Sequence, residues 1–199
     1  MIGLETSRAC AAWKQAKRDG KLGGTPLRFA CTTIVKNLEP PDIHHFNAAQ
    51  GCLGLNSPKE AQAELEKISH SVQSHLVVME LQWQVHAKAN RWQEAVDTAR
   101  AIATQHPEVP FGWIHLSYAL HELKRTPEAY SSLFKVVDKF PQEWLMRYKM
   151  ACYAVQLGQL NEGKEWLSYA YKVGDKNEID KLVATDMDLE PLRQIEQGR

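Results

Sequence analysis

The sequence predicts an all-α protein, an α-solenoid in which helix–turn–helix repeats stack on one another and capping helices close the end. Three observations lead to this prediction. Related segments recur with a period of 34 residues, and the apolar positions inside each segment are spaced as on one face of a helix. Prolines that end helices recur with the same period, since 141 − 107 = 34 for Pro107 and Pro141.

Four columns of residues define this period in the second helix of each repeat. An acidic column is followed directly by a column of small residues, and then by two apolar columns four and seven positions further on. Residues with this spacing share one helical face, and small side chains on that face allow a second helix to approach closely. The columns hold Glu60, Glu94, Glu128 and Glu162; Ala61, Ala95, Ala129 and Gly163; Leu65, Ala99, Leu133 and Leu167; and Ile68, Ile102, Val136 and Ala170.

The predicted boundaries follow from this register and describe one continuous domain. Residues 42–75, 76–109 and 110–143 are predicted as three repeats, and residues 144–177 as a looser fourth copy. Residues 178–199 are predicted as capping helices that cover the last apolar face. Residues 1–41 are predicted as an N-terminal helix pair, a degenerate further repeat, because Leu27, Cys31 and Ile34 repeat the spacing of the later columns.

Charge and composition exclude several classes of protein. The chain has 24 basic and 24 acidic residues, so its formal net charge of zero argues against nucleic-acid binding. No apolar run is long enough to span a bilayer, and the four cysteines form no CxxC pair. We therefore expect a cytoplasmic protein with no membrane segment. Residues 1–37 are nevertheless basic, with seven Lys and Arg against two acidic residues, or 7 − 2 = +5.

The sequence offers little sign of enzymatic chemistry. It contains no phosphate-binding glycine loop, no HExxH motif and no nucleophile elbow. Its eight histidines have no cysteine or carboxylate at the spacing of a metal site, and Cys52 and Cys152 lie among apolar residues, as packed thiols do. We expect no catalytic, cofactor or metal site. A metal-dependent or thiol enzyme is the distant alternative.

The repeat resembles the tetratricopeptide repeat. Residues 110–143 carry its signature: Trp113 at the fourth place, Leu116 at the seventh, Ala129 at the twentieth and Pro141 at the thirty-second. The resemblance covers residues 42–177. The stretches PFGWIHLSYALHELKRTPEA (110–129) and DMDLEPLR (186–193) also resemble small bacterial tetratricopeptide proteins of unassigned function. The resemblance implies a right-handed superhelix.

The same resemblance implies where a partner would bind. In this family the first helices line a concave groove, and carrying its ligand-facing places across gives a largely apolar and aromatic surface. Phe111, Tyr118 and Tyr148 are its expected anchors. We therefore predict a non-catalytic adaptor that binds a protein or peptide partner, as a helix or an extended chain. The predicted groove residues are Phe46, Gln50, Glu80, Gln84, Phe111, Ile114, Tyr118, His121, Tyr148 and Cys152.

Two alternatives remain open at this point. A terminal helix, or the N-terminal helix pair, could already fill the groove. The protein could also be chaperone-like or self-associating, forming a homodimer through its basic N-terminal helices. The sequence identifies neither the partner nor the oligomeric state.

Overall fold

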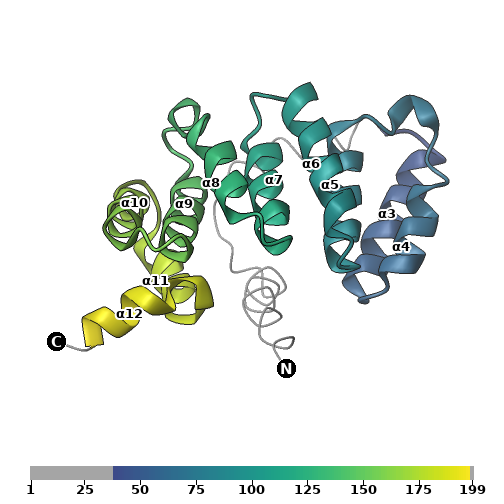
Figure 1. Ribbon diagram of the computed structural model, residues 1–199. Coiled ribbons are helices and arrows are strands. Elements are labelled where there is room, and N and C mark those ends of the chain that lie inside the picture. Colours follow the sequence, from purple (N-terminus) through teal and green to yellow (C-terminus); the bar gives the residue numbers. More distant parts are fainter. Residues whose placement is uncertain (1–37, 198–199) are drawn as a thin grey trace. The chain divides into compact units, whose positions relative to one another are not determined.

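The computed structural model describes residues 38–197, and every regular element in this part of the chain is helical (Figure 1). Residues 1–37 lie outside the described residues, and with them most of the predicted N-terminal helix pair. The described residues divide into two compact units, residues 38–132 and residues 133–197. We call them the N-terminal unit and the C-terminal unit and describe each by itself.

The first helices of the repeats begin at a constant interval. They begin at residues 42, 76, 110 and 144, so that each start follows the previous one by 34 residues. The second helices begin at residues 58, 92, 126 and 160, again 34 apart. The first helices are α3 (Asp42–Gly54), α5 (Leu76–Lys88), α7 (Pro110–Glu122) and α9 (Trp144–Gln156); the second helices are α4 (Pro58–Leu65), α6 (Trp92–Gln105), α8 (Thr126–Phe134) and α10 (Leu160–Val173). The predicted all-α, repeat-built fold class is confirmed.

The turn inside each helix pair also repeats every 34 residues. Asn56, Asn90, Lys124 and Gly158 all have positive φ, between 57° and 80°. In each copy the amide of the following residue donates to the carbonyl five positions earlier, as from Ser57 to Cys52. This is the hydrogen bond of a Schellman motif, which ends a helix with a left-handed residue. The same Schellman motif therefore reverses the chain direction in each of the four helix pairs.

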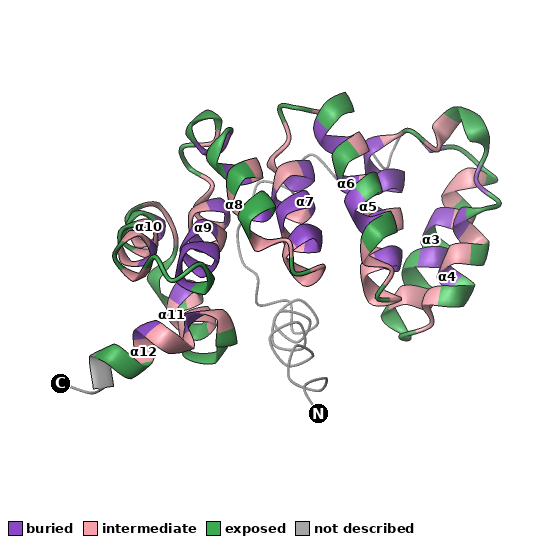
Figure 2. Ribbon diagram, in the orientation of Figure 1, coloured by how far each residue is buried: buried purple, intermediate pink, exposed green. Residues whose placement is uncertain are grey.

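The small-residue column lies where the helices meet. Ala61, Ala95 and Ala129 are fully buried, and Gly163 is buried as well. Figure 2 shows that α5, α7 and α9 are each buried along part of their length. A Cβ atom on Gly163 would lie 2.6 Å from a Cγ2 atom of Val155, so α9 and α10 approach more closely there than a larger side chain permits. Small residues at this column set the separation within each pair.

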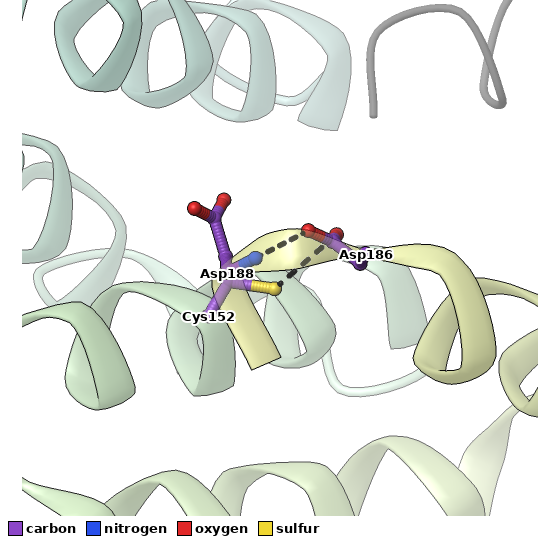
Figure 3. Close-up of side chains that lie close together, drawn as sticks. All are labelled: Cys152, Asp186 and Asp188. Carbon is purple, nitrogen blue, oxygen red and sulfur yellow. Dashed lines mark hydrogen bonds between the residues drawn. The ribbon is translucent and has the colours of Figure 1, made fainter. Parts of the chain in front are cut away.

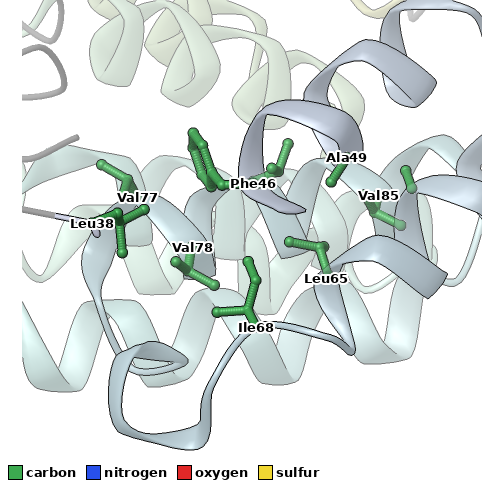
Figure 4. Close-up of a cluster of buried hydrophobic side chains, with 10 residues drawn as sticks. Leu38, Phe46, Ala49, Leu65, Ile68, Val77, Val78 and Val85 are labelled. Carbon is green, nitrogen blue, oxygen red and sulfur yellow. The ribbon is translucent and has the colours of Figure 1, made fainter. Parts of the chain in front are cut away.

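In the N-terminal unit, one hydrophobic core cluster lies between α3, α4 and α5. Leu38 precedes α3 and joins this core, next to Val77 in the first turn of α5 (Figure 4). Phe46 enters the core from α3, and Leu65 and Ile68 enter it from α4 and the residues that follow. The short helix η1 (His70–Val72) lies between α4 and α5.

In the C-terminal unit, three short elements follow the last repeat. They are α11 (Lys176–Thr185), the 3-10 helix η3 (Met187–Leu189) and α12 (Glu190–Gln197), while η2 (Val137–Lys139) precedes α9. Ile179 of α11, Leu189 of η3 and Leu192 of α12 are buried, as expected of a cap that covers an apolar surface. Within residues 38–197, no helix is long and apolar enough to cross a bilayer.

The repeated turns predict opposite effects for two substitutions. Lys124 has a Cβ atom at a φ of 64°, whereas Gly158 has none at a φ of 80°. Lys124→Gly should therefore stabilise the fold, and Gly158→Ala should destabilise it, each by about 1 kcal/mol. Urea unfolding at constant m value measures both changes. Equal effects of the two substitutions would show that the turn conformation contributes nothing.

The close contact of α6 with α7 predicts a second pair of effects. A Cβ atom on Gly112 would lie 2.6 Å from the backbone nitrogen of Ala103, whereas a Cβ atom on Gly51 of α3 would meet nothing within 4 Å. Gly112→Ala should cost about 2 kcal/mol or more because backbone must move. Gly51→Ala, the matched control, should raise the free energy of unfolding by about 0.5–1 kcal/mol, because alanine has the higher helix propensity. Thermal or urea unfolding distinguishes these outcomes; a neutral Gly112→Ala would contradict the close approach.

Candidate protein-binding surface

The predicted groove residues of the N-terminal unit lie on α3, α5 and α7. Helix α5 packs against α3, and its Trp83 contacts α7, so the three first helices are neighbours. Side chains on them differ widely in exposure. Phe46, Phe111 and Ile114 are buried; Glu80, Gln84, Tyr118 and His121 are half-buried; and Gln50 is exposed. We call the last five residues the first-helix face, and only these present surface to a partner without rearrangement.

An aromatic cluster packs against Tyr118 of the first-helix face. The ring of His115 stacks on Phe111 with centroids 3.8 Å apart, and the Trp83 ring meets it edge-on at 4.2 Å. His115 Nδ1 lies 2.9 Å from the carbonyl oxygen of Phe111, which fixes the orientation of the imidazole. Tyr118 is held between Trp83, at 6.2 Å, and Trp92 of α6, at 5.7 Å. The half-buried tyrosine therefore rests on neighbours that leave its ring few alternative positions.

His121 has a local partner that the sequence did not indicate. Its Nδ1 atom lies 3.0 Å from the hydroxyl oxygen of Thr126, the first residue of α8. The side chain thus joins the end of α7 to the beginning of the second helix, across the turn that contains Lys124. Sequence spacing places His121 on the first helix but gives no information about a contact across the turn.

In the C-terminal unit, the chain's own residues cover the corresponding face of α9. Tyr148 and Cys152, the two predicted groove residues of this helix, are 1% and 0% exposed. The hydroxyl of Tyr148 donates to Asp186 Oδ2 at 2.9 Å. The Cys152 thiol donates to the same oxygen at 3.7 Å, as Figure 3 shows. Gln156 also donates to the carbonyl of Asp188, at 3.0 Å. A C-terminal segment therefore occupies this part of the surface.

Asp186 organises the cluster through both carboxylate oxygens. While Oδ2 accepts from Tyr148 and Cys152, Oδ1 accepts the backbone N–H of Asp188 at 3.0 Å and so caps η3. The carboxylate is buried, and Lys149 supplies positive charge nearby. Burial alone would lower the pKa of Lys149, but the negative charges of Asp186 and Asp188 raise it overall, so the ammonium group stays charged.

The same surroundings suppress the chemistry of the two neutral groups. Burial, followed by the negative charge of Asp186, raises the pKa of the Cys152 thiol well above its usual value. Burial likewise raises the pKa of Tyr148, and the negative charge of Asp186 raises it further. At neutral pH the sulfur is a protonated thiol and not a nucleophilic thiolate. The cluster therefore lacks the activated group that a thiol enzyme requires.

Cys152, Asp186 and Asp188 could also supply ligands to a metal ion, since one donor atom of each lies within 4.8 Å of the others. The sequence does not indicate this set, because Cys152 lies 34 residues before Asp186 and no motif connects them. Hydrogen bonds already use both oxygens of Asp186, and Lys149 already balances charge. The hydrogen bonds of Asp186 thus anchor the C-terminal segment to α9.

Aromatic side chains form a partly exposed surface at the end of α8 and on α10. Phe134 and Tyr169 are 57% and 48% exposed. Their rings lie 6.5 Å and 5.9 Å from the half-buried ring of Trp166, and Lys172 Nζ lies 4.8 Å from the centroid of Tyr169. Trp166 thus belongs to a partly exposed cluster, which residue spacing along α10 alone could not show.

The anchoring role of Asp186 predicts a measurable change in thiol reactivity. Asp186→Asn should loosen the cap and remove the charge that keeps Cys152 protonated, so both effects accelerate alkylation of Cys152, by about tenfold. Peptide-resolved mass spectrometry after iodoacetamide labelling separates Cys152 from the other cysteines. Asp138→Asn, which removes the same charge from an exposed residue of η2, should leave the rate unchanged. Identical rates in both variants would contradict the anchoring role.

Comparisons with known proteins identify the architecture. No family model matches the sequence, and no match is found among curated proteins. Among solved structures, a MamA mutant aligns with a TM-score of 0.54 and 16% identity over 70% of this chain and 83% of its own. A second, the RS-1 MamA double mutant, aligns with a TM-score of 0.59 and 15% identity over 87% and 96%. MamA is a tetratricopeptide repeat protein, and at these identities the similarity concerns the fold. The chain therefore has the fold of tetratricopeptide repeat proteins.

Proposed function

We propose that this protein is a non-catalytic adaptor that binds a protein or peptide partner on the first-helix face of its N-terminal unit. The observation that carries the proposal is the position of Tyr118. Its half-buried ring is held by Trp83 and Trp92, so it offers a partner a rigid amphipathic anchor. Rigid aromatic side chains of this kind lose little conformational entropy on binding.

Polar residues on the other first helices of this unit suit recognition of a polypeptide. Glu80 and Gln84 lie one turn apart on α5, and Gln50 lies on α3. A glutamine amide both donates and accepts, as the main chain of an extended peptide requires. The fold of the two MamA structures supports an interaction or scaffold role of this general kind.

The predicted groove residues of the C-terminal unit are not available to a partner. Tyr148 and Cys152 were expected in the groove, but both contact Asp186 and are buried beneath the segment around η3. Phe111 is buried as well, at 7% exposure. Alanine at Phe111 or Tyr148 therefore removes packing before it can report on partner binding. The discriminating substitutions belong at the half-buried positions of the first-helix face.

The proposal predicts the effect of one substitution on affinity. Affinity capture from the source cell identifies partners, and calorimetry then measures each. Tyr118→Ala should weaken binding of a true partner by at least tenfold, since buried aromatic anchors typically contribute 2 kcal/mol or more, roughly, to an interface. Tyr169→Ala, which removes an exposed tyrosine from α10 of the other unit, is the control. Equal affinity of Tyr118→Ala and wild-type protein would refute the assignment of this face.

A further inference from the structure

The N-terminal unit and residues 1–37 carry opposite net charge. Between residues 38 and 132 the chain has seven Lys and Arg and 11 Asp and Glu, or 7 − 11 = −4, whereas residues 1–37 carry +5. Part of the acidic excess lies on first helices, at Glu80 of α5 and Glu122 of α7, both half-buried. Lys88, at the far end of α5, is the one Lys or Arg of that helix, and its one carboxylate, Glu80, lies in the first half.

The point at which residues 1–37 join the described chain lies beside that charge. Leu38 is 5% exposed and belongs to the same core cluster as Val77 and Val78 (Figure 4). Val77 lies in the first turn of α5, three residues before Glu80, a separation of about 4.5 Å along the helix axis. The segment is thus tethered about one helical turn from Glu80. A short tether raises the effective local concentration of a segment to the millimolar range.

The composition of the segment suits the first-helix face. Leu27, Cys31 and Ile34 follow one another at intervals of four and three, and Arg28 and Lys36 accompany them. An apolar stripe flanked by basic residues complements a face that combines the half-buried ring of Tyr118 with the carboxylate of Glu80.

We infer that residues 1–37 bind in cis to the first-helix face of the N-terminal unit and compete there with an external partner. The segment acts as an intramolecular competitor, and its affinity for the face depends on its basic residues. The competition rests on the proposed function of the face, whereas binding of the segment does not.

Photo-crosslinking of the full-length chain tests the inference. A benzophenone amino acid replaces Tyr118 in one variant and Gln84 in a second, so that loss of the Tyr118 ring contacts cannot decide the result alone. A third variant carries the same group at exposed Asp97 on α6, as the control. Mass spectrometry should find crosslinks from positions 118 and 84 to peptides within residues 1–37, at least about fivefold more abundant than from position 97.

Isotope labelling identifies the source of the crosslinked segment. In a mixture of 15N-labelled and unlabelled protein, binding in cis gives crosslinks within one isotopic form only. Mixed crosslinks would instead show a dimer that exchanges its N-terminal segments, and would overturn the inference. Absence of crosslinks to residues 1–37, or equal yields from all three positions, would overturn it too.

Charge reversal tests the electrostatic part. Arg28→Glu with Lys36→Glu changes the segment from +5 to +1, since each reversal removes two charges. The crosslink should fall by about fivefold or more, and Glu80→Lys with Glu122→Lys in the same chain should restore it. Reversal of Lys59 on α4 is the control. Insensitivity of the yield to the Arg28 and Lys36 reversals would refute charge-dependent docking.

A separate measurement distinguishes this inference from the proposed function. If both hold, the Arg28→Glu, Lys36→Glu variant binds an identified partner more tightly than wild-type protein, because its competitor is weakened. If a partner binds the Tyr118→Ala variant with wild-type affinity, the assignment of the binding face is refuted. The crosslinking result does not depend on that outcome. Unchanged partner affinity in the charge-reversed variant, with crosslinks present in wild type, refutes the competition alone.

Discussion

The distance between two helices is limited by the side chains at their crossing, and the architecture of this protein depends on keeping that distance short. Ala61, Ala95 and Ala129 are fully buried where the second helices cross their neighbours, and Gly163 takes the same place in the last pair. Dispersion forces fall steeply with separation, so close approach is needed for the apolar faces to exclude water and interdigitate. Larger residues in this column would separate the helices and leave the stripes that flank it poorly packed.

The period of the repeat was predictable because it recurs in residue types. Helix starts at 34-residue intervals follow directly from columns of Glu, small and apolar residues. Ser57 and Glu60 have the spacing of a capping box, yet the Ser57 side chain makes no capping hydrogen bond. A cap depends on the rotamer of one side chain, which a sequence pattern does not determine.

The face of α9 shows why the candidate site was harder to predict than the fold. The resemblance to the repeat family placed Tyr148 and Cys152 on a first helix, and both lie on α9. Their exposure, however, depends on which residues cover that helix. The covering residue, Asp186, belongs to a segment without periodicity, and neither spacing nor composition connects it with α9. In the N-terminal unit the half-buried state of Tyr118 similarly depends on Trp83 and Trp92, which come from two different helices.

Contacts in each unit join mainly elements that are neighbours along the chain, such as α3 with α4, α5 with α6 and α9 with α10. In such a quasi-linear arrangement, terminal elements have a neighbour on one side only and are the first to fray. The Asp186 cluster ties the residues after α11 back to α9 across the intervening helix pair. It therefore limits fraying from the C-terminus, because a buried polar contact must break before α10 can unfold.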